Sequence, residues 1–243
     1  MWCQGEVVGR IHWHDHLFSL KIKADIAPFQ AGQFVKLAHV VGEKRIARAY
    51  SMINAPNEPE LELLITHVQG GQLSSHLARL QLGDKIAVST RATGFMVISE
   101  LPKARDLWMM ATGSGVSPYL SMLRQGDLWQ QFERVYFVYG VRHTQDLAYA
   151  DELEQWQRTH PLHWLPCVTR EPGFNGITQR IPEALLSGSL EENLGATIAA
   201  PTSHVLLCGN PDFIKATTVI LKEKQLTKHL RRAPGQFSVE KYW

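Results

Sequence analysis

This sequence of 243 residues has few cysteines and little net charge. Its three cysteines, Cys3, Cys167 and Cys208, are odd in number and far apart, and there is no C-x-x-C pair. Both features argue against a disulfide framework and against an iron–sulfur cluster held within the chain, so we expect a reducing, cytoplasmic location. A formal net charge of +2 is too small to indicate a nucleic-acid-binding protein.

Long apolar runs are also missing. No stretch of 18 apolar residues exists, and the amino terminus lacks a basic region followed by an apolar segment. We therefore expect neither a membrane span nor secretion. The hydrophobic content of 44% allows a full globular core, and the length suits one large domain or two ordinary ones.

The first 100 residues alternate short apolar segments with turn sequences such as Ala31-Gly32 and Leu82-Gly83-Asp84. Closely spaced strands of this kind indicate a small antiparallel barrel. One helix, Ser74–Leu80, interrupts them, with Leu73, Leu77 and Leu80 on one side. The predicted strands are Gly5–Ile11, Leu17–Ile22, Gln33–Ala38, Leu61–Ile65 and Lys85–Val88.

After Glu100–Lys103 the pattern changes to apolar strands followed by helical segments. Continuous apolar strands that alternate with helices predict a doubly wound parallel sheet, which binds ligands at the carboxyl ends of its strands. We therefore expect two domains, residues 1–100 and 101–243. The predicted strands are Leu107–Ala111, Val135–Val141, His163–Thr169 and His204–Cys208, and the predicted helices are Pro118–Arg124, Asp146–Thr159 and Asp212–Lys224.

Arg48-Ala49-Tyr50-Ser51 places a cation, an aromatic ring and a hydroxyl within four residues. On a strand Arg48 and Tyr50 share one face, where a guanidinium fork can hold a phosphate and a phenol can stack on a ring system. Taken alone, the same residues also suit an ordinary surface strand.

Two further loops suit phosphates. Gly71 precedes the predicted helix, whose free N–H groups can face an anion, although a plain serine cap explains Ser74 equally well. Thr112-Gly113-Ser114-Gly115 follows an apolar strand but lacks a complete G-x-G-x-x-G.

Three arginines follow the later strands. Arg142 and Arg170 each come directly after a strand, and Arg180 lies in a segment predicted to begin a helix at Gly176-Ile177-Thr178. Two arginines and a threonine in one pocket match a dianionic phosphate better than a hydroxyl, which favours NADP(H) over NAD(H). Solvated surface arginines are the alternative.

Taken in order, these segments resemble the motifs of the ferredoxin-NADP reductase family, especially its bacterial members. The resemblance rests on Arg48–Ser51, Gly71–Ser74, Ala111–Pro118, Cys208–Pro211 and the Tyr242-Trp243 end, and it spans nearly the whole chain. Ser114 stands where threonine is common in the family, and Ser117 where glycine or alanine is usual. The family fold is an antiparallel FAD-binding β-barrel followed by a doubly wound NADP-binding α/β domain.

The resemblance implies sites for FAD and NADP(H), and no metal. The FAD residues that it implies are Arg48, Ala49, Tyr50, Ser51, Leu64, Ile65, Thr66, His67, Gln72, Leu73, Ser74, Thr112, Ser114, Tyr242 and Trp243. The NADP residues are Arg142, Thr169, Arg170, Arg180, Cys208, Gly209 and Asn210.

The resemblance also implies an activity. NADPH gives a hydride to flavin N5, and single electrons then pass through a flavin semiquinone to ferredoxin or flavodoxin. Tyr50 and Tyr242 enclose the ring, Ser51 orients the hydride path, Cys208 positions the nicotinamide, and Glu240 is a candidate proton donor.

A basic cluster close to the carboxyl end suits an acidic electron carrier. A solvated helix end is the alternative explanation, and we expect a monomer.

The alternating His12, His14 and His16 lack further ligands in the nearby sequence, so we expect no metal site there. Two other functions stay open, namely an NAD(P)H:flavin reductase on the same scaffold and a non-enzymatic docking module. The basic cluster comprises Lys222, Lys224, Lys228, Arg231 and Arg232.

Overall fold

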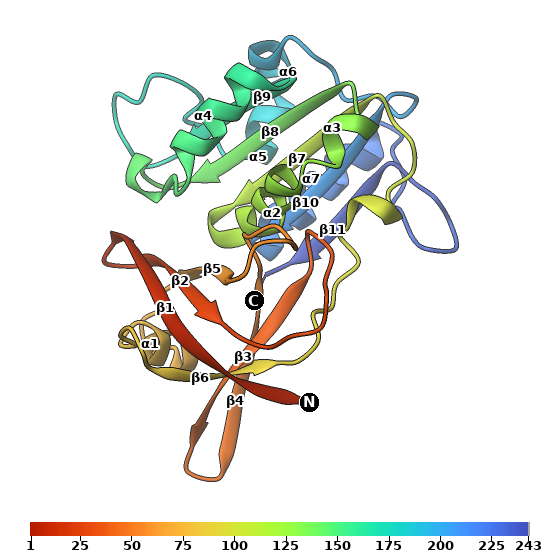
Figure 1. The fold of residues 1–243 in the computed structure, drawn as a ribbon. Helices are drawn as coiled ribbons and strands as arrows, with labels where there is room; N and C mark the ends of the chain where they lie inside the picture. Colours follow the sequence, from red (N-terminus) through yellow and green to blue (C-terminus); the bar gives the residue numbers. More distant parts are fainter. Residues whose placement is uncertain (243) are drawn as a thin grey trace. The chain divides into compact units, whose positions relative to one another are not determined.

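The computed structural model describes residues 1–242 and divides the chain into two units (Figure 1). The first unit comprises Met1–Ile98 together with Ser117–Gly126. The second unit comprises Ser99–Val116 and the chain from Asp127 onward. The chain therefore crosses between the units at Ile98/Ser99, Val116/Ser117 and Gly126/Asp127.

The first unit is an antiparallel barrel, as the sequence predicts. Its sheet has the strand order β4-β3-β6-β1-β2-β5. The sheet closes because Met52, just after β4, pairs with Leu63 of β5, and the Ile53 N–H donates to the Glu62 carbonyl at 2.8 Å. The strands are β1 (Trp2–His14), β2 (Leu17–Lys23), β3 (Phe34–Val41), β4 (Lys44–Ser51), β5 (Leu61–Thr66) and β6 (Lys85–Ser89).

Strand β4 begins at Lys44, upstream of the Arg48–Ser51 segment, and is not one of the strands that the apolar runs predict. Residues Lys44 and Arg45 are exposed, so no apolar alternation marks this strand. Pairing with β3 defines it instead, from Val41 opposite Lys44 to Phe34 opposite Ser51. Figure 1 shows this β3–β4 hairpin extending from the rest of the first unit.

Two helices accompany the barrel. α1 (Gln72–Leu77) begins two residues before the predicted helix, and Leu73, Leu77 and Leu80 are all buried in the barrel core as expected. α2 (Ser117–Gln125) follows β7 in the chain but belongs to the first unit by its contacts.

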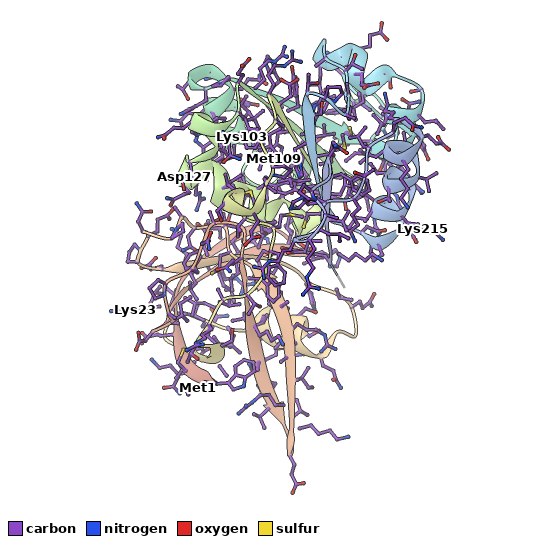
Figure 2. The ribbon with its side chains drawn as sticks, turned by 90° about the vertical axis from the view of Figure 1, so that its right-hand side faces the viewer. Met1, Lys23, Lys103, Met109, Asp127 and Lys215 are labelled. Carbon is purple, nitrogen blue, oxygen red and sulfur yellow. The ribbon has the colours of Figure 1, made fainter. Side chains whose placement is uncertain are left out.

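The second unit contains the predicted parallel sheet, with strand order β11-β10-β7-β8-β9. In Figure 1, α4 lies on the near side of this sheet and α5 and α7 on the far side, which is the doubly wound arrangement. Met109 is fully buried in β7, whereas Lys215 is exposed on α7 (Figure 2). The strands are β7 (Asp106–Thr112), β8 (Arg134–Val141), β9 (Leu162–Val168), β10 (Ser203–Gly209) and β11 (Phe237–Lys241). The helices are α3 (Leu128–Gln131), α4 (Ala150–Thr159), α5 (Ile181–Leu186), α6 (Ser189–Leu194) and α7 (Pro211–Glu223).

The predicted helix at Gly176 was wrong. Ile177 forms a parallel bridge with Cys167 and accepts the N–H of Val168 at 2.9 Å, so this segment is extended alongside β9. α5 begins only at Ile181, where a proline in the first turn favours helix initiation.

Helix α4 also begins later than the sequence predicts. It starts at Ala150 rather than Asp146, because Tyr149 adopts a left-handed conformation with φ 62°. A separate 3-10 turn, Thr144–Asp146, precedes it. In the part of the chain that the structure describes, no helix is long and apolar enough to cross a membrane.

Candidate functional site

The Arg48–Ser51 segment lies at the end of β4, where it pairs with β3. Arg48 is exposed, while Tyr50 is half-buried and packs on the barrel core. Burial raises the pKa of Tyr50 to about 12, opposed by the charge of Arg48. The phenol is neutral at physiological pH with or without this shift, and its ring can stack on a planar group. Ser51, the last residue of β4, is buried.

Strand β5 leads from the barrel core to the α1 turn. Leu64 and Ile65 are buried, and Ile65 belongs to the barrel core. Thr66 is exposed, and the His67 Nε2 lies 3.2 Å from the Ser75 hydroxyl. Thr66 and His67, at the end of β5, are therefore the side chains of this segment that a ligand could reach.

The turn before α1 is closed too tightly for any side chain at Gly71. A Cβ there would lie 2.6 Å from the Ser74 hydroxyl and 2.9 Å from the Val68 carbonyl. The Ser74 hydroxyl accepts the Val68 N–H at 3.2 Å, so it holds the turn. First-turn N–H groups have no partner within the helix, which leaves those of Gln72 and Leu73 as donors toward an anion. This turn fits a diphosphate that approaches the backbone closely.

A second cradle lies at the carboxyl ends of β7 and β10. Gly209 has φ 132°, and a Cβ there would lie 2.3 Å from Thr112 Oγ1. The Thr112 hydroxyl accepts the Asn210 N–H at 2.9 Å. A Cβ on Gly115 would lie 2.6 Å from the Cys208 carbonyl, so the loop Gly113–Val116 rests directly on the end of β10. Main-chain groups and the Thr112 hydroxyl border this edge, where parallel sheets bind their ligands.

Cys208, Glu240 and Tyr242 form a group at the same edge. Cys208 pairs with Glu240 across β10 and β11, and the Tyr242 N–H donates to the Gly209 carbonyl at 3.0 Å. Burial raises the pKa of the Cys208 thiol well above its usual value; the Glu240 charge adds to this, and the Tyr242 hydroxyl opposes it. The thiol is therefore protonated at neutral pH and is a compact neighbour rather than a nucleophile. Trp243 lies outside the described residues.

Two of the three predicted arginines are adjacent at the backbone. The Arg170 N–H donates to the Arg142 carbonyl at 2.8 Å, and both side chains are exposed. Arg180 is exposed at the residue that precedes α5. The Thr169 hydroxyl donates to the Val141 carbonyl at 3.2 Å, so its proton is already used within the loop.

Comparison with known proteins decides the family. Residues 9–95 match an oxidoreductase FAD-binding domain, and residues 109–218 match an oxidoreductase NAD-binding domain. The flavodoxin/ferredoxin–NADP reductase of Escherichia coli K12 is 41% identical over 245 residues, covering 100% of this chain and 99% of that protein. The chain belongs to the flavodoxin/ferredoxin–NADP reductase family.

Two other relatives agree with this assignment. The reductase of the same name from Buchnera aphidicola subsp. Baizongia pistaciae is 38% identical, over 100% of this chain and 99% of that protein. A ferredoxin NADP+ reductase from Neisseria gonorrhoeae, solved with bound FAD and NADP, is 31% identical with a TM-score of 0.93. That similarity covers 100% of this chain and 99% of that one, and the fold described above is the fold of this reductase family.

Sequence reasoning missed one contact near the arginines of this family member. The Glu171 carboxylate accepts the N–H of Thr144 at 2.7 Å and its hydroxyl at 2.9 Å, which lowers the pKa of Glu171. It thereby joins the loops that follow β8 and β9. The hollow between these loops has a volume of about 400 Å³ and is lined by His143, Thr144, Gln145 and Glu171. The sequence does offer one sign of this contact, because Glu171 directly follows Arg170 and Thr144 lies two residues after Arg142.

The basic cluster is only partly free for a partner. The Lys224 ammonium binds Glu191 at 2.8 Å, and Arg231 binds Glu100 at 3.1 Å. Exposed Leu230 lies among the remaining charges. The exposed cations of the cluster are Lys222, Lys228, Arg231 and Arg232, of which Arg231 is the one paired with Glu100.

The amino-terminal histidines do not share one regular strand face. The pairing of β1 with β2 is irregular between His12 and His14, and His16 lies in the following turn. Within residues 1–242, no group of three or more His, Cys, Asp or Glu side chains could hold a metal ion.

Proposed function

We propose that this protein is a flavoenzyme that transfers electrons between NADPH and ferredoxin or flavodoxin. The observation that carries the proposal is its full-length similarity to reductases of that name, with the FAD-binding and NAD-binding domain matches in order along one chain. When bound, FAD accepts a hydride and releases electrons singly, which couples a two-electron donor to a one-electron carrier.

Residues 1–100 hold FAD in this proposal. The exposed Arg48 guanidinium donates to the diphosphate, and the neutral Tyr50 phenol stacks on the ring system. The N–H groups of Gln72 and Leu73 complete the diphosphate site, supported by the closed Gly71 turn. The flavin ring and its ribityl chain are bordered by barrel residues and by two residues of the dinucleotide loop. These are Ala49, Leu64, Ile65, Thr66 and His67 of the barrel and Thr112 and Ser114 of the loop.

Residues 101–243 hold NADP(H). Arg170 and Arg180 bind the 2′-phosphate, and Arg142 binds the bridging phosphates, because paired guanidinium groups suit a dianion. Thr169 precedes Arg170 in this site, and to bind the phosphate its hydroxyl would donate to it in place of the Val141 carbonyl. Gly209 and Asn210 let the nicotinamide approach the sheet edge, next to the protonated Cys208 thiol.

Four side chains orient the hydride path, supply a proton or cover the flavin in this proposal. Ser51 orients the hydride path, and Glu240 supplies a proton close to Tyr242. We assign Tyr242 to the flavin face opposite Tyr50, and Trp243, which lies outside the described residues, to the adenine of FAD.

The basic cluster docks the acidic carrier, with its exposed cations giving orientation and encounter rate. Salt screens the attraction between exposed cations of this cluster and an acidic carrier, so carrier-dependent activity should fall as ionic strength rises. We further propose that the protein acts as a monomer in the cytoplasm.

The test is NADPH-driven reduction of cytochrome c with purified ferredoxin, with purified flavodoxin, and with neither. We expect a yellow protein and rapid reduction with at least one carrier. A colourless protein that reduces only added free flavin would identify a flavin reductase instead. A docking module without enzyme activity would not oxidise NADPH even with ferricyanide as acceptor.

A further inference from the structure

A buried ion pair joins α2 to the barrel. The Arg124 Nη1 lies 2.5 Å from the Glu62 Oε2, and their side chains are only 14% and 4% exposed. Glu62 is the one charged residue of the apolar strand β5. A second carboxylate, that of Glu58, lies 3.9 Å from the same guanidinium.

A second contact from α2 stands beside the first. The Ser121 hydroxyl donates to the Asn54 carbonyl at 2.7 Å. The Asn54 Oδ1 in turn accepts the Glu62 N–H at 2.9 Å, and Asn54 is fully buried. Ser121, Asn54, Glu62 and Arg124 therefore form one connected polar network, which we name the α2 clamp.

The clamp holds the two barrel segments assigned to the flavin. Asn54 lies three residues after Ser51, and Glu62 lies two residues before Leu64. Both segments are thereby tied to one face of one helix.

The same helix continues directly from the dinucleotide loop. Val116 ends the 3-10 turn that rests on Cys208 and Gly209, and Ser117 begins α2 with no residue between them. The chain passes from the second unit to the first at this single peptide bond. Whatever fixes α2 in the barrel therefore fixes the carboxyl end of that loop.

We propose that Arg124 and Glu62 are positioning residues for hydride transfer, which fix α2, the helix into which the dinucleotide loop continues, to the flavin-binding segments of the barrel. This inference rests on the proposed function. A buried ion pair adds little stability over a well-packed apolar pair, so stability alone does not explain it. The directional geometry of the Arg124–Glu62 pair does explain its presence, because the pair fixes the position of α2. A shift of about 1 Å between reacting groups can slow a reaction by about a hundredfold.

The experiment is single-turnover reduction of the bound flavin by saturating NADPH in the FAD-loaded enzyme. Glu62→Gln and Arg124→Met should slow this step by about tenfold or more. FAD content and the KM for NADPH should stay within about twofold of the wild type, and the long-wavelength charge-transfer absorbance of the NADPH complex should weaken. Arg124→Lys keeps the charge and should recover part of the rate; it carries the test if Arg124→Met does not fold.

Arg134→Met is the matched control. Arg134 also pairs with a buried carboxylate, that of Asp106 at 2.9 Å, but at the amino end of β8. Because Arg105 also pairs with Asp106 at 2.8 Å, Arg134→Met should lower the unfolding temperature less than Arg124→Met, and it should leave flavin reduction within twofold of the wild type. Wild-type flavin reduction in all clamp variants, or equal slowing by Arg134→Met, would overturn the inference. A wild-type enzyme that NADPH cannot reduce would instead refute the proposed function.

Discussion

The Asn210 N–H donates a 2.9 Å hydrogen bond to the hydroxyl oxygen of Thr112. This bond joins the loops that follow β10 and β7 at the carboxyl edge of the parallel sheet. It holds Gly209 where a Cβ would be only 2.3 Å from the same hydroxyl. The shape of the proposed nicotinamide site therefore depends on Thr112, an uncharged side chain that acts through this hydrogen bond.

Thr112→Val tests this bond. The substitution keeps the volume but removes the acceptor, and we expect a loss of about 1–2 kcal/mol in the free energy of unfolding. The KM for NADPH should rise while FAD is retained. Urea denaturation, together with steady-state kinetics, measures both effects. Thr112→Ser is the control, since it keeps the hydroxyl; equal effects of the two variants would contradict the role of this bond.

The double variant Arg170→Ala, Arg180→Ala tests cofactor preference. Each guanidinium removed from a dianion should cost about 1.5–3 kcal/mol of binding, so the KM for NADPH should rise by at least tenfold. The KM for NADH should barely change, because NADH lacks the 2′-phosphate. Arg158→Ala, on the exposed face of α4, is the control and should change neither constant. A parallel rise of both KM values would remove the phosphate assignment.

Ser51→Ala tests the hydride path. The hydroxyl is buried at the end of β4, and the truncation is small. We expect hydride transfer from NADPH to slow by about tenfold or more, with flavin binding unchanged. Stopped-flow absorbance of the flavin follows the rate, and the visible spectrum of the purified protein reports occupancy. An unchanged rate in a fully yellow variant would count against the role of Ser51.

Thiol reactivity tests the environment of Cys208. Cys208 and Cys167 are fully buried, and burial raises the pKa of both thiols. Cys3 is partly exposed. At pH 8 we expect a disulfide reagent to modify Cys3 first and the other two only after denaturation. Mass spectrometry of labelled peptides identifies the site; early labelling of Cys208 would show that its thiol is accessible.

Acidification should weaken the second unit through His204. Burial lowers the pKa of this imidazole to about 4, and the charge of His229 adds to the effect. In the unfolded state this imidazole takes up its proton near pH 6.5, whereas the folded state resists protonation down to about pH 4. The free energy of unfolding is therefore unaffected by His204 above pH 6.5 and falls as the pH drops toward 4. The difference of about 2.5 units corresponds to about 3 kcal/mol at the end of this range. Urea titrations at pH 7.5 and 5 measure the slope, and His204→Gln should flatten it; an equal slope in this variant would exclude His204 as the cause.

The local pattern of apolar, charged and glycine residues in the sequence determined most of the strands, the buried side of α1 and the family. Continuous apolar runs predicted the parallel strands because a strand buried on both faces needs no polar side. Leu73, Leu77 and Leu80 marked the buried side of α1 because their spacing follows the helical period. The ordered motifs from Arg48 to Tyr242 indicated the family, since each places a charge, ring or glycine where a loop meets a strand.

Tertiary structure alone decided the rest. β11 exists because Phe237 pairs with Val205, and the segment around Ile177 is extended because it pairs with Cys167 of β9. Such pairings join residues far apart in sequence, so no local propensity contains them. The clamp between Arg124 and Glu62 is of the same kind. Glu62 was visible as a charge in an apolar strand, but only folding could supply the cation that neutralises it.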